Sequence, residues 1–108
     1  MSKSTIARGN AIRLNMIQVK LTPAAVGTTA GAEQTFSVQD IAVGDFVEVN
    51  CNAAQNTNVG ITNARVSATN VLAIGFSNVA SVAETPTAGL YNVLITRCED
   101  SPIPSNTI

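Results

Sequence analysis

Paired carboxylates are the residues of this chain whose types come closest to catalytic chemistry. Two carboxyl groups held at a fixed separation can act as acid and base in hydrolysis. Glu99 and Asp100 are adjacent but fall in a proline-containing stretch, and Asp45 and Glu48 lie on opposite parities at the start of one predicted strand. The chain has no histidine, which removes the commonest general base and the commonest metal ligand. We therefore expect a protein that is not an enzyme.

Cys51 and Cys98 are the other candidates for site chemistry. They are separated by 46 residues, which is not the spacing of a zinc site. In a reducing compartment we expect free thiols packed as small apolar groups, although both fall at predicted strand ends where a disulfide is sterically conceivable. Gly27 and Gly31 lie in a loop without the Lys-Ser/Thr that follows a phosphate-binding loop. No metal and no cofactor are expected.

Arg65 stands out because the predicted strand around it is otherwise made of small or apolar residues. Such an arginine could pair with Asp45 or Glu48 across a subunit interface, where arginine is favoured in ion pairs. Alternatively, it faces water from an exposed sheet surface. These three charged residues and Tyr91 are the candidate interface residues of the chain.

The elements that must position these residues are three strands in the middle of the chain, Phe46–Cys51, Val59–Ala68 and Val71–Phe76. Apolar residues alternate with polar or small ones in each strand, which is the period of a half-buried β-strand. The connections, Asn52 to Asn58 and Thr69-Asn70, are too short for a crossover helix, so we expect one antiparallel sheet. The residues expected to share the apolar faces are Val47, Val49, Cys51, Ala64, Val66, Ala68, Leu72, Ile74 and Phe76.

The flanking segments predict further strands. Ala11–Leu21 has apolar residues on one parity up to Met16 and on the other from Ile17, which predicts a β-bulge or a bend between sheets. Thr22–Glu33 is expected to be a long loop, which either makes contacts or is a flexible surface excursion. Gln34–Gln39 is a short predicted strand with Phe36 and Val38 facing inward.

The last predicted strand, Leu90–Arg97, is apolar on both faces and should lie centrally in a sheet. About seven short strands separated by turns predict an all-β, antiparallel β-sandwich or jelly roll. We expect three parts: an N-terminal arm at 1–10, a β-sandwich domain at 11–97 and an extended C-terminal tail at 98–108, which contains Pro102 and Pro104.

The composition restricts the partners. Only 12% of the residues are charged, and the net charge is −1. A weakly charged surface favours subunit or partner contacts over an unusually neutral monomer. No basic stripe suggests direct nucleic-acid binding, and no apolar run is long enough to span a membrane. The N-terminal stretch lacks the apolar block of a signal peptide, so we expect the protein to stay in the cytoplasm where it is made.

The central and C-terminal motifs together resemble small capsid cement, or head decoration, proteins of tailed bacteriophages. The resemblance covers roughly Asp40 to Arg97 and consists of strand and turn motifs without a catalytic fingerprint. The motifs are VGDFVEVN at 43–50, GITNARVSA at 60–68, LAIGFSN at 72–78 and PTAGLY at 86–91.

This resemblance implies a β-sandwich or jelly-roll body on the outer surface of an assembled phage head. There it would bridge capsomers and stabilise the shell against internal DNA pressure. The implied partners are the major capsid protein and further copies of the chain, as a homodimer or homotrimer. The protein would be made in the host cytoplasm and end up in the virion.

A carbohydrate-binding jelly-roll module of a phage appendage is the main alternative. Sugar sites commonly use exposed aromatic rings, and Phe36 and Phe76 are predicted to point inward, so only Tyr91 or Phe46 could stack on a sugar. A small hydrolase is disfavoured by the missing histidine. A filament subunit is disfavoured by the missing secretion signal.

Overall fold

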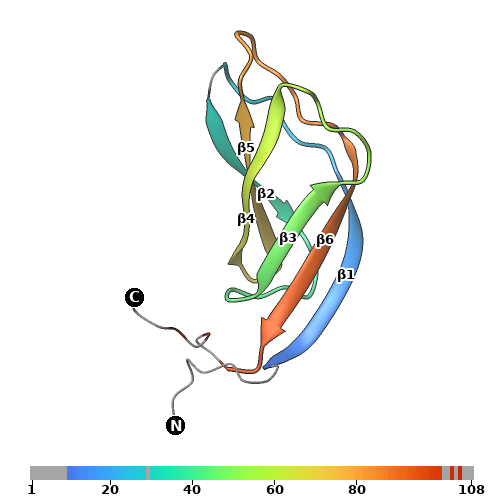
Figure 1. The fold of residues 1–108 in the computed structure, drawn as a ribbon, viewed down its shortest axis with the longest axis vertical. Coiled ribbons are helices and arrows are strands. Elements are labelled where there is room, and N and C mark those ends of the chain that lie inside the picture. Colours follow the sequence, from blue (N-terminus) through green and yellow to red (C-terminus); the bar gives the residue numbers. More distant parts are fainter. Residues whose placement is uncertain (1–9, 29, 101–102, 104, 106–108) are drawn as a thin grey trace.

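The computed structural model describes residues 10–28, 30–100, 103 and 105. Six β-strands occur within these residues. The strands are β1 (Ala11–Leu21), β2 (Gly31–Ser37), β3 (Phe46–Cys51), β4 (Val59–Ala68), β5 (Val71–Asn78) and β6 (Gly89–Cys98). They form two antiparallel three-stranded sheets, ordered β1-β6-β3 and β2-β5-β4 (Figure 1). No helix occurs over these residues, and thus none that could cross a membrane. The predicted all-β class is confirmed.

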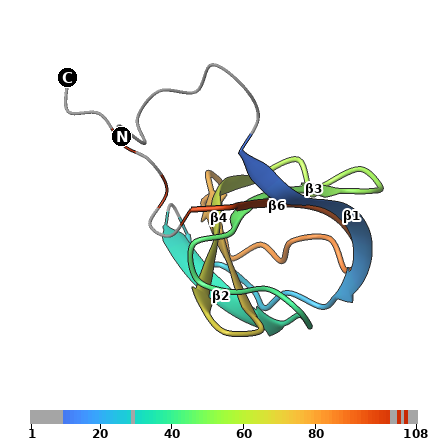
Figure 2. The same ribbon diagram turned by 90° about the horizontal axis from the view of Figure 1, so that it is seen from below.

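The core lies between the two sheets, which Figure 2 shows from one end. Each strand places alternate side chains on opposite faces, so each sheet contributes one apolar face to the core. Strand β5 contributes Leu72, Ile74 and Phe76, all completely buried, as the alternation predicts. Strand β6 contributes Tyr91, Val93 and Ile95, which are also completely buried. Because the chain has no tryptophan, branched aliphatic side chains fill most of this space.

The predicted bounds of β3 and β4 match the structure, and β6 is the central strand of its sheet, as its two apolar faces predict. The expectation that β3, β4 and β5 form one sheet is wrong. Strand β3 pairs with β6, while β4 pairs with β5. The polar connection of residues 52–58 carries the chain from one sheet to the other, so it is a crossing between sheets and not a hairpin loop.

The expected bulge or bend between Met16 and Ile17 is also wrong. Strand β1 pairs with β6 without interruption from Arg13↔Arg97 to Leu21↔Gly89. The one irregularity in this pairing lies at the start of the strand, between Ala11 and Arg13. The apolar residues therefore occupy both faces of a strand that is regular from Arg13 onward. Ile17, Val19 and Leu21 pack on the core, whereas the apolar residues of the other parity face away from it.

The loop before β2 is shorter than predicted, because β2 begins at Gly31. Its described residues are fixed to the body and do not form a free excursion. Val26 is 1% exposed and exchanges backbone hydrogen bonds with Glu84, at 2.8 and 3.1 Å. The buried Asn78 donates its side-chain N–H to the carbonyls of Val26 and Val82, at 3.1 and 2.9 Å. This amide thus joins two loops that are far apart in sequence.

Both cysteines are free thiols, as expected. Cys51 is opposite Tyr91 in the β3–β6 pairing, and Cys98 is the last residue of β6. Cys98 follows Tyr91 by seven residues along the extended strand β6, which is about 23 Å at roughly 3.3 Å per residue. A disulfide between them is therefore excluded in this fold, since its Cα atoms must lie within about 7 Å.

Candidate binding surface

The outer face of the β1-β6-β3 sheet carries exposed apolar side chains at one end. On β1, Ile12, Leu14 and Met16 are 64%, 71% and 72% exposed. Phe46 on β3 is 54% exposed, and Leu94 on β6 is partly exposed between the two edge strands. We call these five residues the apolar patch. Isolated exposed apolar residues are ordinary, but a contiguous group on a sheet face marks an interaction site.

The strand register brings the patch together from three distant segments. Leu14 and Phe46 both lie opposite Thr96, and Met16 and Glu48 both lie opposite Leu94. Because residues of one row share a face in an antiparallel sheet, these side chains form two adjacent rows. Glu48 is exposed and stands at the edge of the patch on β3. The structure therefore places this candidate residue beside the patch.

A row of amide side chains bounds the patch. Gln18 donates to the Asn92 side-chain oxygen at 2.9 Å, and Asn92 donates to the Asn50 side-chain oxygen at 2.9 Å. The three residues come from β1, β6 and β3, so the row crosses the whole sheet. Exposed amides that bond to one another have fixed orientations and leave their remaining donors and acceptors for a partner. The face thus has an apolar half and a polar half.

The chain enters and leaves the body beside the patch. The Glu99 N–H donates to the Asn10 carbonyl at 2.7 Å, next to the start of β1 and the end of β6. We call this end of the molecule the arm end. The segments predicted as arms, 1–10 and 98–108, lie mostly outside the described residues, yet both are attached here.

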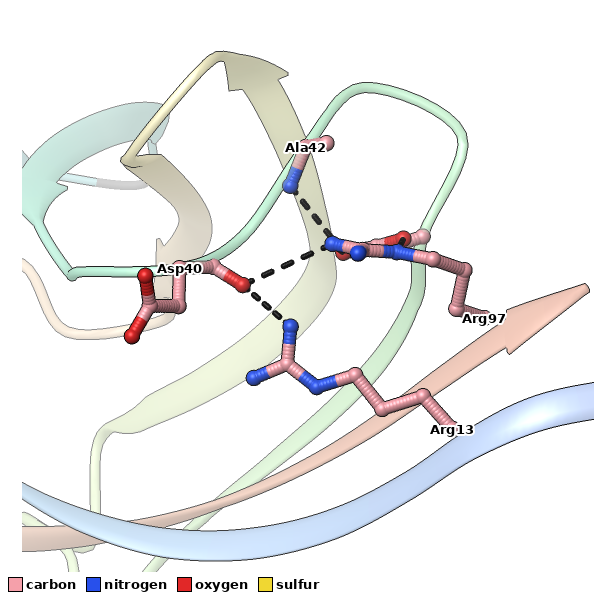
Figure 3. Close-up of polar contacts among 5 residues, drawn as sticks. Arg13, Asp40, Ala42 and Arg97 are labelled. Carbon is pink, nitrogen blue, oxygen red and sulfur yellow. Dashed lines mark hydrogen bonds and ion pairs between the residues drawn. The ribbon is translucent and has the colours of Figure 1, made fainter.

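Asp45 lies at the arm end in an ion cluster. Its carboxylate accepts two hydrogen bonds from Arg97, at 2.7 and 2.9 Å, and one from the Ala42 N–H at 3.0 Å. Arg13 and Arg97 both donate to the Asp40 carbonyl (Figure 3). The cluster thereby fixes the segment before β3 to the ends of β1 and β6.

The electrostatics of Asp45 follow from these contacts. The hydrogen bonds from Arg97 hold the pKa of Asp45 below its usual value, against the opposing effect of burial. The Asp45 side chain is only 2% exposed. Its carboxylate is therefore engaged within the chain and stabilises the arm end; we expect its removal to loosen that end.

Arg65 pairs within the chain, with Glu33 and with neither of its predicted partners, Asp45 and Glu48. Its guanidinium donates to both oxygens of Glu33, at 2.8 and 2.9 Å. This hydrogen bonding lowers the pKa of Glu33 and raises that of Arg65. Arg65 lies opposite Ala73 in the β4–β5 pairing, and Glu33 lies opposite Gly75 in the β2–β5 pairing. The pair thus spans the small residues of β5 on the outer face of the second sheet.

Asp45, Glu48 and Arg65 nevertheless line one groove, between the adjacent edges of β3 and β4. Proximity in this groove does not make them an ion pair, because Asp45 and Arg65 bond to other residues. The sequence offered no signal for Glu33 as the partner of Arg65, since Glu33 falls in the stretch predicted to be a loop.

Tyr91 is not a surface residue, which corrects its place among the candidate interface residues. Its side chain is completely buried, and burial raises the pKa of its hydroxyl. The hydroxyl donates to the Thr87 carbonyl at 2.7 Å and accepts from the Gln55 side-chain N–H at 2.9 Å. Tyr91 therefore connects two loops at the end opposite the arm end. Of the two aromatic residues suggested for sugar stacking, Phe46 is the exposed one.

Comparison of the chain with protein-family models, with curated proteins and with solved structures finds no match.

Proposed function

We propose that the chain is a structural virion protein, a capsid cement or decoration protein that binds the outer surface of a phage head. In this proposal a β-sandwich or jelly-roll-like body carries extended N- and C-terminal arms and bridges neighbouring capsomers. The protein is not an enzyme and needs no cofactor. The observation that carries the proposal is the apolar patch, which lies beside the point where both arms are attached.

The patch suits binding to a protein surface. Burying an exposed leucine or methionine side chain yields about 1.5–3 kcal/mol, and the patch offers such side chains in adjacent rows on a rigid sheet. Polar groups around an apolar centre are the usual arrangement of a protein interface, and the amide row and Glu48 provide them. The major capsid protein is the proposed partner, with further copies of the chain as the second. Neither nucleic acid nor membrane is a proposed partner.

Stabilisation of the shell follows from linkage. A protein that binds the assembled lattice but not the free capsid subunit shifts the equilibrium toward the lattice. Arms of about ten residues reach roughly 30 Å when extended, enough to contact a neighbouring capsomer. Several weak contacts made by one attached molecule combine into a much higher apparent affinity. The protein would be made in the host cytoplasm and act on the outer surface of the capsid.

The proposal is tested by the resistance of heads to rupture. Heads assembled from the major capsid protein of the same genome are filled with DNA, incubated with or without the purified chain, and heated while DNA release is followed. We expect saturating protein to raise the release temperature. Unchanged release, combined with binding in a glycan screen, would support the carbohydrate-binding alternative instead.

Two truncations test the contribution of the arms. Deleting residues 1–10 or 99–108 should leave a folded body, because the hydrophobic core and the side chains packed on it lie within residues 17–95. Both truncated proteins should bind heads more weakly. If each binds as tightly as the full chain, the arms do not make the contact.

A further inference from the structure

The outer edge of strand β1 pairs with no other strand of the described residues. Strand β1 has 11 residues and is the longest of the six. It pairs with β6 on one side, and no other strand among the described residues pairs with it on the other side. Its register with β6 is regular from Arg13 to Leu21, so the free edge is regular over the same length.

The other edge strands are shorter, less regular or partly covered, compared with β1. Strands β3 and β4 face each other across one groove, which is lined by residues 46–49 of β3 and 61–65 of β4, so each edge has a neighbouring strand over this part. Strand β4 also has two register irregularities, and β2 has only 7 residues. Proteins prevent unwanted edge pairing with short strands, bulges, prolines, charges or covering segments. Strand β1 has no proline, its charged residues are Arg13 and Lys20, and its one register irregularity lies at its start, between Ala11 and Arg13.

The hydrogen-bond alternation shows which backbone groups of β1 point outward. The Asn52 N–H donates to the Leu90 carbonyl at 2.9 Å, so Leu90 and every second residue after it direct their backbone groups toward β3. The residues between them, including Tyr91 and Val93, must bond to β1. Their partners in β1 are the odd-numbered residues, such as Val19 and Ile17. The residues with outward N–H and C=O groups are therefore Leu14, Met16, Gln18 and Lys20.

We propose that two copies of the chain pair through this edge, antiparallel, to form one continuous six-stranded sheet. The proposed partner of the edge is a second copy, because an antiparallel pair of identical strands is self-complementary about a two-fold axis. Each outward N–H of one β1 then meets an outward C=O of the other β1. Full overlap places Met16, the middle residue of β1, opposite its counterpart. Lys20 and Arg13 lie on opposite faces of the sheet, so this register brings no like charges together.

The symmetry has a consequence for the apolar patch. The two-fold axis of such a pair runs perpendicular to the sheet, so the outer faces of both copies point in the same direction. The Met16 side chains of the two copies then adjoin across the axis, and each Leu14 lies opposite Gln18 of the other copy, so the two patches meet at Met16 and form one surface. This consequence, unlike the pairing itself, rests on the proposed function: the dimer would attach to the shell through two patches at once and bind by avidity.

Sedimentation of the full chain over a range of concentrations tests the pairing. We expect a species of twice the 11.1 kDa chain mass. The variant Met16→Pro removes an outward N–H that takes no part in the β1–β6 ladder, and proline is tolerated at such edge positions. Its matched control, Met16→Thr, removes the same side chain but keeps the N–H. The proline variant should dissociate at least tenfold more readily than the threonine variant, with the same circular dichroism spectrum.

Amide hydrogen exchange of the unmodified chain provides a second measurement that does not depend on a variant folding. The outward amides of Leu14, Met16, Gln18 and Lys20 should become protected as the concentration rises through the dimerisation range. The odd-numbered amides of β1 should be protected at every concentration, because they bond to β6. Rapid exchange of the outward amides at high concentration would overturn the pairing.

The outcomes separate this inference from the proposed function. A monomer or trimer, or a dimer that both Met16 variants form equally well, overturns pairing through β1. If such a protein still binds heads, the proposed function stands without the pairing. A dimer with protected outward amides that ignores heads supports the pairing and contradicts the proposed function.

Discussion

Replacing Leu14 and Met16 together by threonine separates the binding role of the apolar patch from the stability of the fold. The two side chains are 71% and 72% exposed, so folding buries less than a third of each. Burying a whole side chain of this size is worth about 1.5–3 kcal/mol, and threonine is favoured in strands. We therefore expect the double variant to lose no more than about 1–2 kcal/mol of unfolding free energy.

The effect on binding should be larger. A partner that covers the patch buries the remaining two-thirds or more of each side chain, which is worth about 1–2 kcal/mol per residue. Together the two substitutions should weaken binding to heads by roughly 30- to 700-fold, at about 1.4 kcal/mol per tenfold.

Urea unfolding and co-sedimentation with heads measure the two quantities. The matched control is Val79→Thr with Val82→Thr, which removes two other exposed apolar side chains, 75% and 59% exposed, away from the patch. The control should bind heads like the unmodified chain. Ile95→Ala, in the core, should instead cost about 2–5 kcal/mol of stability. Unchanged binding of the patch variant, or a stability loss as large as that of Ile95→Ala, would refute the assignment of the patch.

Three further predictions concern the polar contacts. Asp45→Asn should cost about 2 kcal/mol at neutral pH, because the carboxylate accepts charged hydrogen bonds. Since the native pKa of Asp45 is lowered, this contribution to stability is complete above the unfolded pKa of about 3.9 and is lost as the pH falls through the native pKa. The unfolding free energies of the two proteins, measured in urea, should therefore converge in acid. A constant difference at all pH values would contradict this. Tyr91→Phe should cost about 1–3 kcal/mol of unfolding free energy, because the partly buried side-chain N–H of Gln55 loses its acceptor; an unchanged urea midpoint would contradict this. Arg65→Gln should leave the thermal midpoint and the sedimentation mass nearly unchanged, because the ion pair with Glu33 is 56% and 39% exposed; a change in mass would return Arg65 to the subunit interface.

Alternation along the strands made much of the fold predictable. The bounds of β3 and β4, the buried face of β5 and the central place of β6 all follow from residues that repeat with a period of two. Strand partners were harder to predict, because a connection of seven residues can close a hairpin or cross between sheets. The chain takes the second course between Cys51 and Val59, and local sequence does not distinguish the two.

The apolar patch was not predicted, because apolar residues on either parity of a strand were expected to be buried. The change of apolar parity after Met16 predicts a bulge or a bend between sheets, if a strand buries all of its apolar residues. In the structure the strand stays regular, and the residues before the change face outward. The signal was present in the sequence, but only an exposed apolar face explains it. Tyr91 is the reverse case: it is one of the predicted interface residues, yet its parity with Val93 and Ile95 places it in the core.

Saturation binding to assembled heads tests the central claim most directly. Empty heads built from the major capsid protein of the same genome are mixed with increasing amounts of the purified chain and sedimented. The account predicts that the bound chain reaches a plateau at a fixed whole-number ratio to the capsid subunits, and that free capsid subunits bind none. Heads that sediment without the chain, at concentrations where it is folded, would contradict the claim that this protein is a capsid decoration protein.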